Sequence, residues 1–156
     1  GRAWLERAVA AGEEVSSIGL QLLLMGETEE GRAWLERAAQ IHGPKSAMDI
    51  GVQLIAQGEA DEGRVWLERG AEARGYKDAV LAGLTLMSLG KAEQGRVWLE
   101  RVAERRGPKA ALFAGLLLVN SGEVDTGRAM LERAAEEGNA RARRALTRLT
   151  SQLDDD

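Results

Sequence analysis

Residues 31–38 read GRAWLERA, and this phrase decides how the whole 156-residue chain is interpreted. It also opens the chain, and it returns as GRVWLERG from Gly63, GRVWLERV from Gly95 and GRAMLERA from Gly127. Other glycines keep the same interval of 32 residues, in the columns Gly19, Gly51, Gly83, Gly115 and Gly26, Gly58, Gly90, Gly122. Columns held in register over four copies indicate an array of repeated supersecondary units.

Each repeat is predicted to hold two helices joined by a glycine turn. A first helix, such as 46–57 or 109–121, ends at the Gly58 column, because glycine adopts a left-handed backbone most cheaply. Acidic residues such as 59–62 then favour the N-terminus of a second helix through the helix dipole. That second helix contains the repeated sequence GRAWLERA or one of its variants. It ends at Gly43, Gly75, Gly107 or Gly138, and Pro44 and Pro108 stand in the first turn of the next helix, where proline is tolerated.

The apolar spacing agrees with this reading. Gly63, Trp66, Leu67 and Gly70 fall at i, i+3, i+4 and i+7, which is one helical face. Glycine inside a helix costs about 0.5–1 kcal/mol relative to alanine. Its repetition at Gly51 and Gly63 therefore predicts a close approach of two helix backbones.

These patterns predict an all-α fold, an α-solenoid of stacked hairpins, because one such hairpin cannot bury its own apolar face. We expect four helix-turn-helix repeats within a single domain at 1–152. Its parts are a half repeat at 1–11, repeats at 12–43, 44–75, 76–107 and 108–138, and a C-terminal helix at 139–152, followed by an acidic tail at 153–156.

Composition excludes several classes of protein. The net charge of −4 does not suit a nucleic-acid binder that works by bulk attraction to phosphate. The chain has no cysteine and one histidine, His42, so thiolate chemistry and His-rich metal sites are not supported. No apolar stretch reaches the roughly 18 residues that span a bilayer. Phosphate-loop, serine-hydrolase and EF-hand motifs are missing, so the sequence predicts no enzyme, cofactor or metal site.

The repeat resembles the tetratricopeptide family, and the WLERAAEEGN-like phrasing of the second helix is most similar to its Sel1-like branch. The resemblance covers nearly the whole chain. The unit of 32 residues is shorter than is usual for either branch, and the family's proline at the end of the unit occurs only as Pro44 and Pro108. The resemblance implies a right-handed solenoid that acts as a protein-interaction scaffold.

In that family the first helices line a concave groove, and the resemblance carries this role to defined positions here. The groove positions so implied are Glu13, Ser16, Leu20, Leu23, Lys45, Met48, Val52, Ile55, Lys77, Val80, Leu84, Met87, Lys109, Leu112, Leu116 and Val119. Most are apolar, and an apolar patch of several hundred Å² usually marks an interaction site. The alternative is that neighbouring first helices bury these residues among themselves.

Three groups of polar or aromatic residues need a separate interpretation. The first helices begin with lysines, Lys45, Lys77 and Lys109, although a cation at this end opposes the helix dipole. Either an acidic rim on a ligand favours these lysines, or they are solvated charges. The positions of a carboxylate clamp hold residues such as Met48 and Val80, so capture of a C-terminal tail is not supported. The column Trp4, Trp34, Trp66, Trp98 and Met130 is expected to pack between repeats, and His42 is expected at the surface.

We therefore expect a non-enzymatic module that binds an amphipathic or apolar peptide segment in its groove, as part of a larger cytoplasmic scaffold or signalling protein. No nucleic-acid or membrane partner is expected. The alternative is a self-associating structural array. The chain begins with a second helix that lacks its first and ends with a first helix that lacks its second, so copies could join head to tail as a homo-oligomer.

Overall fold

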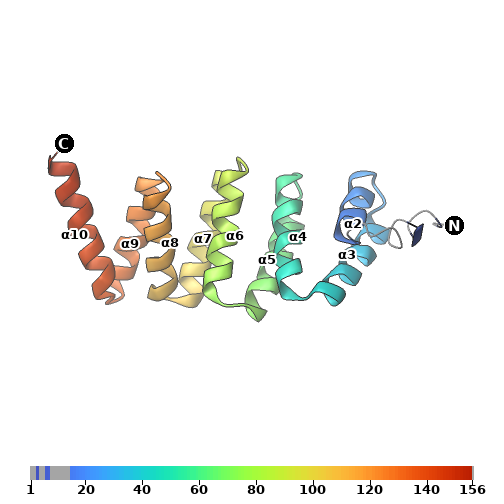
Figure 1. Ribbon diagram of the computed structural model, residues 1–156, viewed down its shortest axis with the longest axis horizontal. Coiled ribbons are helices and arrows are strands. Elements are labelled where there is room, and N and C mark those ends of the chain that lie inside the picture. The colour runs from blue at the N-terminus through green and yellow to red at the C-terminus, as the bar shows by residue number, and fades with distance from the viewer. Residues whose placement is uncertain (1–2, 4–5, 8–14, 156) are drawn as a thin grey trace. The chain divides into compact units, whose positions relative to one another are not determined.

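The computed structural model describes residues 3, 6–7 and 15–155, with side chains described up to residue 152. Every regular element in that part of the chain is an α-helix (Figure 1). The helices are α2 (Val15–Leu24), α3 (Thr28–His42), α4 (Pro44–Ala56), α5 (Ala60–Ala73), α6 (Tyr76–Ser88), α7 (Ala92–Arg106), α8 (Pro108–Asn120), α9 (Val124–Glu136) and α10 (Ala140–Asp155). Consecutive helices pack as pairs, so the prediction of an all-α repeat fold of the α-solenoid class is confirmed. Most of the expected half repeat at 1–11, with Trp4, and also Glu13, lie outside the described residues.

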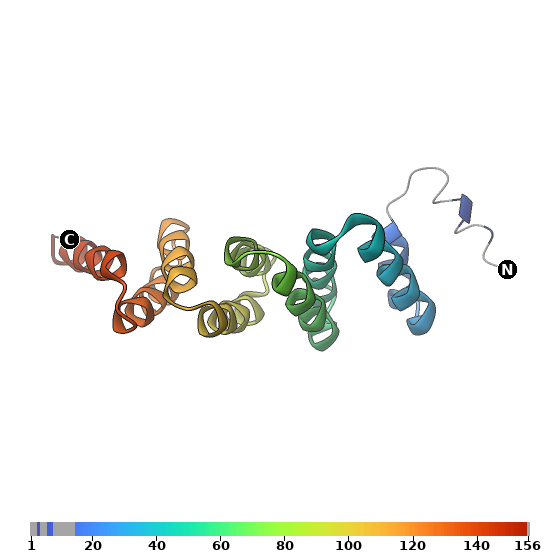
Figure 2. The ribbon, with the colours of Figure 1, turned by 90° about the horizontal axis from the view of Figure 1, so that it is seen from below.

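The chain divides into two compact units. Unit 1, Gly1–Arg74, holds α2 to α5, and unit 2, Gly75–Asp156, holds α6 to α10. In unit 1, α2 packs on α3, α3 on α4, and α4 on α5. In unit 2, α6 packs on α7, α7 on α8, α8 on α9, and α9 on α10. Figure 2 shows several of these helices nearly end-on.

The turn inside each repeat is a glycine-based helix stop. At the end of α4, the N–H of Glu59 donates to the carbonyl oxygen of Leu54 at 2.8 Å, and the N–H of Gly58 donates to that of Ile55 at 3.0 Å. This pair of bonds defines the Schellman motif, which satisfies carbonyls that the helix leaves free. Gly58 has φ +94°, and the other members of its column are also left-handed: Gly26, Gly90 and Gly122. The predicted role of this column is confirmed.

The two helices of a repeat cross at paired glycines. A Cβ built on Gly63 would lie 2.7 Å from the carbonyl oxygen of Gly51, which real side chains essentially never do. The same contact recurs for Gly31 with Gly19, Gly95 with Gly83, and Gly127 with Gly115. The predicted close approach of two helix backbones is therefore confirmed. It explains why the sequence keeps glycine at helical positions where it is intrinsically unfavourable.

The connections between repeats are of two kinds. Gly43 and Gly107 are each the only residue between two helices, with φ +83° and an extended ψ, a backbone conformation available essentially to glycine alone. Pro44 and Pro108 follow in the first turn of the next helix, as predicted. Between α5 and α6 the connection has two residues, Arg74 and Gly75, and both have negative φ. Gly75 therefore holds no conformation that requires glycine.

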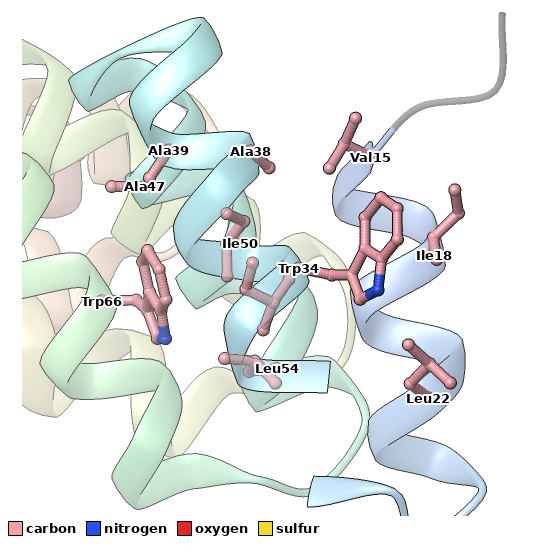
Figure 3. Packing of buried hydrophobic residues seen from close by; sticks show 11 residues of the cluster. Val15, Ile18, Leu22, Trp34, Ala38, Ala39, Ala47, Ile50, Leu54 and Trp66 are labelled. Atoms are coloured by element: carbon pink, nitrogen blue, oxygen red, sulfur yellow. The ribbon is translucent and has the colours of Figure 1, made fainter. Parts of the chain in front are cut away.

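The core of unit 1 is built by residues at the predicted helical spacing. Figure 3 shows Trp34 of α3 beside Val15, Ile18 and Leu22 of α2. Leu35 and Leu67, one residue after the tryptophans, are fully buried. Burying a leucine side chain contributes about 1.5–3 kcal/mol, so these positions provide much of the stability of each hairpin. In unit 2 the same role falls to Leu86, Leu99, Leu118 and Leu131, which are also fully buried.

Candidate interaction surface

The apolar groove residues implied for α4 belong to the core of unit 1. Met48, Val52 and Ile55 are only 5%, 6% and 4% exposed. Ile55 lies over Gly63 and Met48 over Gly70, where the missing glycine side chains leave room for them. These three side chains are therefore buried, and Ile55 and Met48 pack on the second helix α5 of their own repeat rather than on a neighbouring first helix. They leave little apolar surface on α4.

The implied groove residues of α2 are intermediate in their exposure to solvent. Ser16, Leu20 and Leu23 are half-buried, and Leu23 packs over Gly31 as Ile55 packs over Gly63. At the end of the same helix Leu24 is 60% exposed, and Met25 in the following turn is 66% exposed. Among the first helices of unit 1, apolar side chains are thus exposed at the C-terminal end of α2 rather than along α4.

Unit 2 retains apolar surface on its first helices. Val80 and Leu112 are buried, but Leu84, Met87 and Val119 are half-buried and Leu116 is 37% exposed. Leu81, on α6, is 47% exposed. We call Leu81, Leu84 and Leu116 the apolar surface of unit 2.

Sequence reasoning missed Leu81 as a surface residue, although the repeat contains a signal for it. The column that holds it reads Ser17, Asp49, Leu81 and Phe113. This column is polar in unit 1 and apolar in unit 2, so it distinguishes the two units where the repeated phrase does not. A search restricted to the shared phrase could not find it.

Aromatic contacts join α6 to α8 within unit 2. The rings of Tyr76 and Phe113 meet edge to face, with 6.1 Å between centroids and 78° between planes. Lys77 Nζ lies 5.8 Å from the Phe113 centroid, a cation–π distance. Lys77 therefore has a partner within its own unit. Lys45 and Lys109 are exposed, and their role on a ligand stays a prediction.

Ion pairs join α3 to α5 within unit 1. Arg32 Nε donates to Glu62 Oε1 at 2.9 Å, and this hydrogen bond, with the charge of Glu62, raises the pKa of Arg32. Arg69 Nη1 lies 2.7 Å from Glu36 Oε1, and the same guanidinium stands 4.8 Å from the Trp66 ring centroid. Each pair links the second helices of two successive repeats and helps to fix how these helices are aligned with each other.

The tryptophan column is buried, and the hydrogen bond described for Trp98 joins the two helices of one repeat rather than neighbouring repeats. Trp34, Trp66, Trp98 and Met130 are 8%, 6%, 4% and 3% exposed. Trp98 Nε1 donates to the carbonyl oxygen of Ala79 at 2.8 Å, which satisfies its buried donor. His42, in contrast, is exposed at the end of α3.

Residues 3, 6–7 and 15–155 hold no group of three or more histidine, cysteine, aspartate or glutamate residues that could bind a metal ion. None of the helices described there combines the length and the apolar character needed to cross a lipid bilayer.

Comparison with known proteins adds a distant structural likeness. No protein-family model matches the chain, and no curated protein matches its sequence. The solved structures of MamA AMB-1 and MamA MSR-1 are each 22% identical to it, with a TM-score of 0.39. The alignments cover 90% of this chain and 81% or 86% of the MamA chains. A likeness at this level assigns no function to the chain.

Proposed function

We propose that this chain is a non-enzymatic protein-interaction module of a larger cytoplasmic scaffold or signalling protein, and that its apolar surface in unit 2 binds an amphipathic or apolar peptide segment. Val80 and Leu112, the buried groove positions of unit 2, contribute packing that supports this surface. No cofactor or metal takes part in the proposed role.

One observation carries the proposal. Leu81 and Leu116 are 47% and 37% exposed, whereas Leu86 and Leu118 of the same two helices are fully buried. The core of unit 2 is therefore complete without the exposed leucines. Apolar side chains that the core does not use, gathered on α6 and α8, are typical of a surface that a partner covers.

The test is the double variant Leu84→Glu and Leu116→Glu. We expect it to abolish binding of an amphipathic peptide made of leucine and glutamine, measured by fluorescence anisotropy, with little loss of helicity by circular dichroism. The matched control is Val97→Glu, because Val97 is 42% exposed on a second helix of the same unit. The control variant should bind like the unmodified protein. A double variant that unfolds would show that these leucines belong to the core, and the proposal would fail.

Self-association is the alternative proposal, and the dependence of the mass on protein concentration distinguishes it from peptide binding. A structural array would give a mass that rises with protein concentration in light scattering, with or without peptide. A peptide-binding module would keep one mass and still bind the peptide.

A further inference from the structure

Three arginines share one exposed side of α10. Arg141, Arg144 and Arg148 are spaced i, i+3 and i+7, so they form one stripe along the helix, which we call the arginine stripe. All three are exposed. The side chains that α10 buries, Ala142 and Leu149, occupy a different side of the helix. The stripe is therefore not needed to attach α10 to α9.

The charges of α10 oppose its own helical stability. Arg141 with Arg144, and Arg144 with Arg148, are like-charge pairs at the spacings i, i+3 and i, i+4, which destabilise a helix. Arg141 and Arg144 also lie in the N-terminal part of the helix, where the dipole disfavours cations, and the first turn of α10 has no acidic residue. The second helices α3, α5, α7 and α9 have acidic residues in their first turns, whereas the first helices α2, α4 and α8, like α10, have none.

Several arginines elsewhere in the described residues are paired with carboxylates. Arg64 pairs with Asp61 and Arg96 with Glu93, both at i, i+3, and Arg32 pairs with Glu62 of the next repeat. Arg144 and Arg148 have no acidic residue three or four positions away in either direction. Within the described residues, no ion pair joins the arginine stripe to a carboxylate.

We propose that the arginine stripe binds a carboxylate-rich polypeptide segment, and that it thereby selects which partner occupies the apolar surface of unit 2. The inference rests on the proposed function for the apolar half of the contact. Guanidinium groups bind carboxylates through paired, charge-assisted hydrogen bonds, which suits an acidic flank of a peptide. Both α8 and α10 pack on α9, so the two halves of the contact belong to one unit.

Charge favours a protein segment over a nucleic acid as the occupant. Unit 2 contains 13 basic and 12 acidic residues, a net charge of only +1, and the whole chain has a net charge of −4. Nucleic-acid binding at physiological salt is favoured by a large excess of positive charge on the domain, which unit 2 does not have. A short acidic peptide needs only a local stripe.

The probe is an amphipathic peptide that repeats Leu-Glu-Glu-Leu, and its reference is the same peptide with glutamine in place of glutamate. The intact chain should bind the acidic peptide more tightly in fluorescence anisotropy, and added salt should reduce the difference. Arg144→Gln should weaken binding of the acidic peptide about three- to tenfold, the effect of one lost charge-assisted contact. It should leave binding of the glutamine peptide unchanged.

Arg143→Gln is the matched control, because Arg143 is an exposed neighbour on a different side of α10. Arg143→Gln should bind the acidic peptide like the unmodified chain. Equal affinity for the two peptides would overturn the arginine-stripe proposal and leave the apolar surface standing. Loss of acidic-peptide binding in Arg144→Gln, together with no effect of Leu116→Glu, would support the stripe and refute the proposed function. Tighter binding to a DNA duplex than to the acidic peptide would also overturn the stripe proposal, as would binding of neither peptide.

Discussion

Units 1 and 2 use the same repeated phrase and differ at the positions around it. Both contain the glycine crossing, the glycine turn and the fully buried leucine of the second helix. Unit 1 has 13 acidic and 8 basic residues, a net charge of −5, whereas unit 2 has a net charge of +1. Unit 1 joins its second helices by ion pairs and buries the apolar residues of α4. Unit 2 joins its first helices α6 and α8 by an aromatic contact and leaves Leu81 and Leu116 on these helices exposed.

This difference shows that scaffold and surface are encoded separately in a repeat. The invariant positions build the hairpin and are therefore equivalent in the two units. The variable positions determine what each unit exposes. Matched substitutions at the same repeat position in each unit can test both halves of this statement.

The largest effect is expected from Leu67→Ala and Leu131→Ala. These leucines occupy the same repeat position in α5 and α9, and they are 0% and 1% exposed. Each substitution should lower the free energy of unfolding by about 2–5 kcal/mol, through lost burial and the cavity left behind. Urea denaturation measures it. A loss in one unit only would break the claim that the two share one scaffold.

A smaller loss is expected from Gly63→Ala and Gly127→Ala. In both, the new Cβ would lie within 3.0 Å of a carbonyl oxygen of the facing helix. Overpacking of this kind costs about 1–3 kcal/mol. Gly75→Ser is the control, because nothing lies within 4 Å of its Cβ position and its φ is −76°. Thermal unfolding should show the first two variants less stable and the control unchanged or slightly more stable, because serine is a preferred N-cap.

Phenylalanine substitutions of the buried tryptophans should cost different amounts of stability in the two units, because the polar contacts of these tryptophans differ. Trp98→Phe removes a buried hydrogen bond to Ala79 and should cost about 0.5–1.5 kcal/mol beyond the lost ring volume. Trp66→Phe keeps an aromatic ring under Arg69 and should cost less. Chemical denaturation of both variants measures the difference, and equal losses would contradict it.

The smallest effect is expected at the exposed ion pairs. Glu36→Gln breaks the pair with Arg69 and should lower the free energy of unfolding by about 0.2–1 kcal/mol, with the loss reduced at high salt. Glu132→Gln, at the same repeat position in unit 2, is the comparison variant. No ion pair of Glu132 is described within residues 15–155, so its substitution should change stability less. Denaturation at low and high salt tests both.

Much of the fold could be predicted from residue spacing. The 32-residue interval placed both helices of each repeat, and glycine's conformational freedom placed the turns at Gly26, Gly58, Gly90 and Gly122. Glycine at Gly51 and Gly63 predicted the helix crossing, because no other reason offsets its cost inside a helix. Gly75 was less informative, since its place at the end of a repeat suggested a requirement for glycine that its backbone does not have.

The candidate site was harder to predict. Spacing alone places Val52 and Leu116 at the same repeat position in α4 and α8, yet Val52 is 6% exposed and Leu116 is 37% exposed. The period of the sequence is identical at the two positions, so their burial depends on the side chains that pack around them.

By itself, the sequence determined the repeat, its two helices, their turns and their crossing points, because each depends on local backbone preferences and on the period of the apolar residues. Only the tertiary structure decided which apolar side chains are buried and which arginines find carboxylates. Burial and pairing depend on the volume and charge that neighbouring helices present, and residues far apart in the chain supply both.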